Sequence, residues 1–403
     1  MFVPLTAVPR DYAWGSHTAI AEVLGSQPSG GPEAELWLGA HPGAPTRIVD
    51  AAALGGAQDL KAWIEQDPAA ALGGLQGLPF LLKVLAADHP LSLQAHPDLA
   101  RAAAGFADEN ERGIPLDAPF RNYKDALHKP ELIVALRDGF QALCGFRELG
   151  ATDALLSALA ATAADEAGRA AIESLRARVA APGGLSDVVG WLLGDAPADV
   201  IAAVVAAAAG PADAAPDRWV AERTLVATLA EEYPGDAGIV VATLLNLVTL
   251  RAGEALYLPA GNIHAYLRGI GIELMAASDN VLRGGLTPKH VDVPELLSVL
   301  EFEPRPVPWL PSVNVGAGLD LFVPDVRDFE LLRAEVTTET TISGAEFELP
   351  GPGIVIVTSG EVTIAGATSS TTLARGEYAY VTPDEATLRF SGAGTLFLAT
   401  TQP

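Results

Sequence analysis

The stretch LRAGEALYLP, residues 250–259, decides how the whole chain is interpreted, because LARGEYAYVT at 373–382 resembles it. The two stretches share Leu, Gly, Glu and Tyr at equal spacing. Glycine between alternating apolar positions is typical of a turn between two strands. We therefore predict two related β-barrels, the alternative being two unrelated hairpins with similar turn chemistry. At the same spacing His264 of the first copy matches Thr387 of the second, so only the first copy carries a histidine there.

The character of the chain changes along its length. Residues 1–149 contain short β-rich runs separated by Gly and Pro, which predict the first part of an all-β domain. Residues 150–234 are rich in Ala, Leu and charged residues at helical spacing, which predicts an inserted domain of several short helices. Breaks between these helices are expected at 181–184, 195–199 and 210–217.

The β character returns after the predicted insert. Residues 235–310 continue the first β domain, with the apolar run 238–250 read as a strand and 294–300 as a helix. The Pro-rich stretch 303–311 marks a linker, and residues 311–403 form a last domain of strands and turns. The predicted fold class is mainly β with α: two barrels and an inserted helical domain.

Length and charge restrict the class of protein. A chain of 403 residues with 49% hydrophobic residues predicts a globular protein of two or three domains. Its 25 basic and 50 acidic residues give a formal charge of −25, which argues against nucleic acid or an anionic membrane as a general partner. An anionic small substrate would need a locally basic pocket.

Location and redox compartment follow from two further observations. The N-terminal stretch lacks the pattern of a secretory signal, and the apolar runs are too short for a membrane span, so we expect a cytoplasmic protein. The single Cys144 forbids an internal disulfide and fits a reducing compartment. We interpret this thiol as a small buried hydrophobe rather than a nucleophile.

A polar row interrupts the apolar stretch PLSLQAHPDL. In an extended strand Ser92, Gln94 and His96 share one face, while the intervening apolar residues share the other. With Glu131 and His264, two of these residues offer a set of imidazole, carboxylate and amide ligands that suits Zn²⁺. A hydrogen-bonded, half-buried histidine is the alternative for each imidazole. Spacing does not show whether the segments meet.

Other charged residues lie close to these positions in the sequence. Lys83 sits inside an apolar run, Lys129 lies two residues before the carboxylate, and Arg283 follows Asp279 in one short stretch. Each cation is either part of a site or a surface charge, and Asp279 is either a general base or a turn cap. For His128 a structural role is favoured over proton transfer. The remaining histidines, which are not predicted as ligands, are His17, His41, His89 and His290.

Five ordered motifs together carry a family resemblance: YAWGSHTAI at 12–20, AELWLGAHPGAP at 34–45, LPFLLKVLAADHPLSLQAHPD at 78–98, HKPELIVAL at 128–136, and LPAGNIHAYL through LTPKHVD at 258–292. In this order they resemble type I mannose-6-phosphate isomerase. The resemblance is strong over the β segments and covers the helical insert only by position. It implies a cupin fold with a catalytic barrel, a helical insert and a metal-free second barrel.

The resemblance also implies site residues, one Zn²⁺ per chain and a sugar-phosphate substrate. The family's zinc ligands match Gln94, His96, Glu131 and His264, its catalytic arginine matches Arg283, and its substrate contacts match Ser92, Lys83 and Lys129. The implied enzyme is a cytoplasmic monomer with neither nucleic-acid nor membrane partners. It would supply mannose 6-phosphate for GDP-mannose synthesis or act in mannose catabolism.

The implied reaction moves a proton between C1 and C2 of an opened sugar through an enediol. The base is left open between Asp279, His128, Lys129 and a metal-bound water. Two rival readings remain: a cupin oxygenase with Fe²⁺, since two histidines and a carboxylate also suit iron, and a non-catalytic sugar-binding or structural double barrel.

Overall fold

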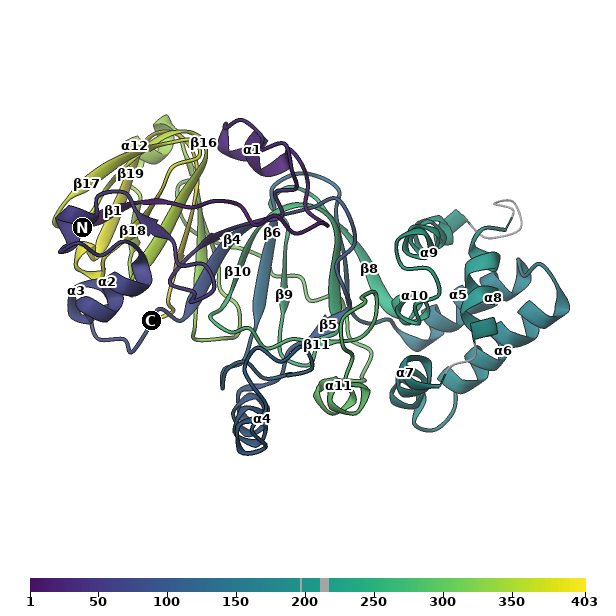
Figure 1. Cartoon of the computed structure of the whole chain (residues 1–403). Helices are drawn as coiled ribbons and strands as arrows, with labels where there is room; N and C mark the ends of the chain where they lie inside the picture. Colours follow the sequence, from purple (N-terminus) through teal and green to yellow (C-terminus); the bar gives the residue numbers. More distant parts are fainter. Residues whose placement is uncertain (196–197, 211–216) are drawn as a thin grey trace.

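The computed structural model describes residues 1–195, 198–210 and 217–403, and it is a mixed α/β structure built around two antiparallel sheets (Figure 1). The helical insert lies at one end of the molecule and the C-terminal sheet at the other. The helices are α1 (Ala19–Leu24), α2 (Leu60–Gln66), α3 (Pro68–Leu72), α4 (Leu99–Glu111), α5 (Leu149–Ala161), α6 (Glu166–Val179), α7 (Gly184–Gly194), α8 (Ala198–Ala208), α9 (Val220–Glu232), α10 (Gly238–Thr243), α11 (Val293–Val299) and α12 (Thr338–Ser343).

The first sheet has nine strands and centres on the long strand β10, which pairs with β4, β5, β6 and β7. Its outer face around β5 is covered by apolar residues of the helical insert, so the polar residues of that segment are directed inward. The strands are β2 (Glu35–Leu38), β4 (Phe80–Ala87), β5 (Gln94–Ala95), β6 (Glu131–Ala135), β7 (Phe140–Phe146), β8 (Leu245–Leu250), β9 (Ala255–Leu258), β10 (His264–Ala276) and β11 (Leu282–Arg283).

The second sheet has ten strands and packs against the first over a shared apolar core. Its central pair is formed by its two longest strands, β16 and β19. The strands are β1 (Phe2–Thr6), β3 (Arg47–Ile48), β12 (Val313–Gly316), β13 (Leu319–Phe322), β14 (Glu330–Val336), β15 (Glu346–Glu348), β16 (Gly353–Ala365), β17 (Ser370–Ala374), β18 (Tyr378–Val381) and β19 (Thr387–Thr400).

The similar segments at 250–259 and 373–382 form equivalent turns. Each turn contains a glycine with positive φ, Gly253 at 85° and Gly376 at 86°. In each, the following glutamate accepts a hydrogen bond of 2.8 Å from the backbone N–H three residues earlier. Both turns use the same cap and lead into the strands β9 and β18, so the expected turn between two strands is present at both places.

The likeness continues along the strands that follow these turns. His264 opens β10 and Thr387 opens β19. Both strands then bend at a glycine with positive φ, Gly269 at 115° and Gly392 at 110°. A side chain at either glycine would collide with the neighbouring strand, at 2.7 Å from Phe140 Cα in the first case. Thus β10 and β19 correspond over most of their length.

The structure differs from the expectations in three segments. The 1–149 segment is not all β, because it contains α1 to α4, and its strands β1 and β3 join the second sheet. The run 238–250 begins as helix α10 rather than as a strand, since a fully buried apolar run fits either element. The polar row in 90–99 contains a strand of only two residues, because the adjacent prolines cannot donate to a ladder.

Other expectations about the chain hold. The predicted helix at 294–300 is α11, and the break at 181–184 separates α6 from α7. Of the other two breaks, residues 196–197 and 211–216 lie outside the described part of the chain. No single described helix is both long and apolar enough to cross a membrane, and α7 and α8 meet that criterion only as a pair bent by 104°.

Candidate active site

Three predicted ligands meet in the interior of the first sheet. The ligand atoms of His96, Glu131 and His264 all lie within 4.8 Å of one another, and all three residues are buried. One carboxylate oxygen lies 3.1 Å from Nε2 of His96 and the other 3.2 Å from Nε2 of His264. The tertiary structure therefore brings together the group that spacing alone left separate.

Local backbone structure explains why these segments meet. Glu131 opens β6 and is the register partner of Leu258 at the end of β9. The turn 259–263 then reverses the chain, so that His264 opens β10 beside the carboxylate. Within this turn the N–H of Gly261 donates to the backbone carbonyl of His96 at 2.9 Å, which ties the third ligand segment to the other two.

Each histidine is oriented by a backbone carbonyl on its far side. Nδ1 of His96 lies 2.7 Å from the carbonyl oxygen of Asn280, and Nδ1 of His264 lies 2.9 Å from that of Asn262. A carbonyl only accepts, so each Nδ1 carries the proton. Each Nε2 atom is then unprotonated, with its lone pair directed at the shared centre, as in histidine metal ligands.

Hydrogen bonding and protonation both fit a cation at this centre. Nε2 of His96 and Oε2 of Glu131 are buried and make no hydrogen bond. Burial, followed by the charge of Lys129, lowers the pKa of His96 to about 4, so this imidazole is neutral. Burial acts to raise the pKa of Glu131, but Lys129 and the histidines hold it well below its usual range. Unsatisfied lone pairs on neutral imidazoles and a carboxylate are what Zn²⁺ requires.

The predicted amide ligand also reaches the group. Gln94 is the register partner of both His264 and Arg283, so β5 lies between β10 and β11. Its amide nitrogen Nε2 lies 3.4 Å from Nε2 of His264. A side chain that also carries an amide oxygen is therefore adjacent to the three convergent ligands.

The metal group opens onto a cavity of about 430 Å³, the first pocket. Of the predicted site residues, this pocket is lined by Lys83, Gln94, Lys129, Glu131, Asp279 and Arg283. Ser92 lines instead a neighbouring cavity of about 450 Å³, the second pocket, which shares Gln94 and Arg283 with the first. The two pockets are therefore neighbours on either side of the side chains that they share.

Lys83 belongs to a buried network that sequence analysis did not find. Its ammonium lies 3.2 Å from Glu35 and 2.9 Å from Glu273, and it stacks over the ring of Trp37. Register explains the contact, since Lys83 on β4 is the partner of Trp37 on β2 and of Glu273 on β10. The available signal was a charged residue inside an apolar strand, which applies to Glu273 in IELMA as it does to Lys83.

The protonation of this network follows from its burial. Burial raises the pKa of Glu273, an effect that Lys83 opposes. Burial acts to lower the pKa of Lys83, but the two carboxylates raise it above its ordinary value, so the lysine is charged. A buried carboxyl with a raised pKa that faces a pocket is suited to exchange protons with a ligand bound there.

The other acid–base candidates differ in position. Asp279 lines the first pocket and pairs at 3.0 Å with His41, a residue that was not predicted as functional. Burial acts to raise the pKa of Asp279, but His41 and nearby lysines lower it. Lys129 pairs with Glu131 at 3.0 Å. His128 pairs with Asp328 at 3.0 Å and does not line the pocket, as its favoured structural role predicted.

Arg283 differs from the other cations of the site. It lines both pockets, and its guanidinium makes no hydrogen bond or ion pair with any residue that the structure describes. Burial lowers its pKa, though an arginine stays charged at neutral pH. Lys83 and Lys129, by contrast, are each neutralised by a carboxylate. Arg283 is therefore available to an anionic ligand.

Comparison with known proteins agrees with this site. The family model for the type I phosphomannose isomerase catalytic domain matches residues 2–149. The mannose-6-phosphate isomerase of Salmonella typhimurium is 38% identical over 397 residues, which is 96% of each chain. The human mannose-6-phosphate isomerase is 31% identical over 409 residues, covering 95% of this chain and 93% of the human one.

Solved structures give the same result. A zinc-bound crystal structure of mannose 6-phosphate isomerase matches the full length of both chains with a TM-score of 0.86 at 35% identity. A second, with zinc and yttrium, gives 0.85 at 34% identity. The similarity therefore extends over the whole fold, including the helical insert and the second sheet. The chain belongs to the mannose-6-phosphate isomerase family, and it is an isomerase.

Proposed function

We propose that this enzyme interconverts mannose 6-phosphate and fructose 6-phosphate, with one Zn²⁺ held by His96, Glu131, His264 and Gln94. The observation that carries the proposal is the buried group of two imidazoles and a carboxylate whose free lone pairs converge beside a pocket. When bound, zinc supplies Lewis-acid stabilisation of negative charge on the substrate oxygens at C1 and C2.

The protein's own groups then have distinct roles. Arg283, which carries a permanent charge without a carboxylate partner, stabilises the charge that develops on the enediol. Lys129 sits 3.0 Å from Glu131 and faces the pocket, where its ammonium can donate to a sugar hydroxyl. Lys83 faces the same pocket from β4 and contacts the sugar from the opposite wall.

Proton transfer between C1 and C2 needs a carboxylate or an equivalent base in the pocket wall. Asp279, expected from the sequence, lines the pocket and is ionised. Glu273 is a second candidate, which its elevated pKa and its contact with Lys83 favour, because a base works best with a pKa near the working pH. Measuring the acidic limb of the rate profile separates the two.

The phosphate is assigned to the second pocket. Arg283, Lys289 and the hydroxyl of Ser92 line it, and none of its described lining residues is a carboxylate. An acidic protein repels an anionic substrate overall, but the basic groups gathered in this pocket attract the phosphate locally. The sugar then extends from the second pocket into the first, past Gln94 and Arg283, which the two share.

The remaining expectations complete the proposal. The two sheets are two cupin-type barrels, divided into a catalytic domain (1–149 with 235–310), a helical insert (150–234) and a metal-free C-terminal domain (311–403) with β1 and β3 added to it. The enzyme acts as a cytoplasmic monomer and supplies mannose 6-phosphate for GDP-mannose synthesis or mannose catabolism. The equivalent turns at Gly253 and Gly376 support the two-barrel arrangement.

A coupled assay tests the function. Mannose 6-phosphate is supplied and fructose 6-phosphate is measured, before and after chelation and after zinc is restored. We expect activity to be lost with the metal and to return with zinc. Full activity after metal analysis has confirmed removal would overturn the zinc mechanism, and no turnover with metal present would overturn the assignment. Oxygen consumption by the iron-loaded protein would favour the oxygenase alternative.

A further inference from the structure

One fully buried side chain joins the metal group to the wall of the substrate pocket. Asn280 lies directly after Asp279, and 0% of its surface is exposed. Its backbone carbonyl holds Nδ1 of His96 at 2.7 Å. Its side chain points the other way, into the segment that precedes β6. The two ends of one residue thus contact the metal ligand and a pocket loop.

The side-chain amide of Asn280 is saturated by that loop, residues 114–127. Oδ1 accepts the backbone N–H of Lys124 at 2.7 Å and that of Asp125 at 3.3 Å. Nδ2 donates to the backbone carbonyls of Asp125 at 2.9 Å and Leu127 at 2.8 Å. Buried amides with all their partners satisfied fix the geometry of both partners, because moving either leaves polar groups unpaired.

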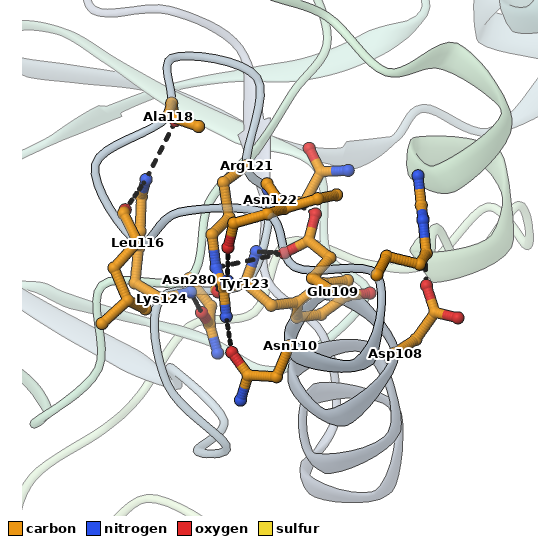
Figure 2. A network of polar contacts seen from close by, with 12 residues as sticks. Asp108, Glu109, Asn110, Leu116, Ala118, Arg121, Asn122, Tyr123, Lys124 and Asn280 are labelled. Carbon is orange, nitrogen blue, oxygen red and sulfur yellow. Dashed lines mark hydrogen bonds and ion pairs between the residues drawn. The ribbon is translucent and has the colours of Figure 1, made fainter.

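The 114–127 loop contributes directly to the pocket. Leu116 and Lys124 line it, and Nζ of Lys124 donates to the carbonyl of Leu116 at 2.7 Å (Figure 2). The loop has a separate anchor at its far side, where Glu109 accepts the backbone N–H groups of Asn122 and Tyr123 at 3.0 and 2.8 Å. The loop is also held by Asp125, which accepts hydrogen bonds from Ser278 and Asp279. Asn280 is therefore one of several attachment points, and it is distinguished by a backbone carbonyl that contacts His96.

We propose that Asn280 is a positioning residue that couples the 114–127 loop to the orientation of His96. The loop holds the side chain, the side chain fixes the peptide that carries the carbonyl, and the carbonyl directs Nε2 of His96 toward the metal. Partners of this kind, one shell beyond a metal ligand, typically change metal affinity by 10- to 100-fold. The inference rests on the proposed function only in treating His96 as a zinc ligand.

The experiment measures zinc affinity without substrate, by competition with a chelator, alongside kcat and KM. For Asn280→Ala we expect a zinc Kd raised by roughly 10-fold or more together with a raised KM. Glu109→Gln loosens the far anchor of the loop, so it is expected to raise KM with a zinc Kd within about twofold of the parent. Gln402→Ala removes a partly buried amide that donates to the carbonyls of Pro324 and Phe329 between β13 and β14, and it is expected to change neither zinc Kd nor KM.

Two results would overturn the proposal: a zinc Kd for Asn280→Ala equal to that of the parent, or an equal weakening in Glu109→Gln, which would indicate general loosening. Asn280→Ser, which keeps a polar group in the buried position, is scored in the same assay in case the alanine variant does not fold. Lack of turnover by the parent protein would contradict the proposed function and leave the zinc comparison intact, so the two failures are distinguishable.

Discussion

Strands β10 and β19 each follow the same kind of turn by one intervening strand and have glycines with positive φ at corresponding positions, yet only β10 carries a site. The turns before them share the glycine conformation and the glutamate cap. At matching positions β10 has His264 and Glu273, whereas β19 has Thr387 and Leu396. Two strands with similar backbone conformation can therefore differ in function, because a few side chains on a common scaffold decide whether a metal can bind.

The residues buried around β10 and β19 differ in polarity as well. The first sheet buries ionisable residues that are paired, such as Lys83 with Glu273. At the matching place the second sheet has Leu396, which packs among apolar residues. Burying paired charges is costly and is retained where they serve chemistry, whereas an apolar core needs only packing. We therefore interpret the second sheet as a structural support for the first.

The largest effect on activity is expected when the first residue of β10 is replaced by the residue at the matching position of β19. His264→Thr removes one of the imidazole ligands, and we expect zinc to be lost and turnover to fall roughly 1000-fold, about 4 kcal/mol of stabilisation. Metal analysis and the coupled assay measure the two effects. Thr387→Val is the matched control and should leave both unchanged. Retention of zinc and full turnover by His264→Thr would contradict the ligand assignment.

Removing the unpaired cation should separate catalysis from metal binding. We expect Arg283→Ala to lower kcat/KM by roughly 100-fold or more, because a preorganised charge at the developing enediolate is lost. Zinc content should stay at the parental level. The control is Arg333→Ala, which removes an arginine that pairs with Asp320 in the second sheet. A loss of zinc equal to the loss of activity would show that Arg283 acts on the metal group instead.

Replacing each candidate base should have a smaller effect on turnover, and the pH dependence of the parental rate distinguishes the two candidates. We expect Glu273→Gln to lower kcat by roughly 100-fold and Asp279→Asn by less. A base must be unprotonated, so the parental rate falls as the pH drops through its pKa. That limb lies above 4.5 for Glu273, whose pKa is raised, and below 3.8 for Asp279, whose pKa is lowered. An acidic limb at the lower position would favour Asp279.

The smallest expected effect is on the free energy of unfolding, and it depends on how two buried glutamates differ in their surroundings. Glu131 has Lys129 beside it, whereas burial raises the pKa of Glu330 in β14 to about 7. A raised pKa gives stability that is present below 4.5 and is lost as the pH rises through about 7. We expect the free energy of unfolding to fall by on the order of 1 to 2 kcal/mol from pH 5 to 8.

Denaturant unfolding of Glu330→Gln measures this contribution. The variant should lose that part of the pH dependence and be more stable than the parent at pH 8. Glu361→Gln, which changes an exposed carboxylate of the same sheet, serves as the control. Identical pH dependence in the parent and in Glu330→Gln would show that the carboxyl is not destabilised by burial.

Local patterns predicted much of the fold and part of the site. Turn chemistry at Gly253 and Gly376 was readable because positive φ and a glutamate cap are local properties. The helical insert was predicted from the helical spacing of its apolar residues. The apolar run that begins at 238 was misread as a strand, since a buried helix and a buried strand are both uniformly apolar. The pairing of β1 with β18 was not predictable, because it joins the two ends of the chain.

By itself the sequence determined which chemical groups were available: two imidazoles, a carboxylate and an amide of metal-binding type, with cations nearby. Only the tertiary structure decided which of these groups share a centre, because Glu131 and His264 meet through strand register. It alone decided that Lys83 is neutralised by Glu35 and Glu273, and that the guanidinium of Arg283 has no charged partner among the described residues. Burial and pairing are properties of contacts between distant segments, and these contacts set both the charge and the direction of each side chain.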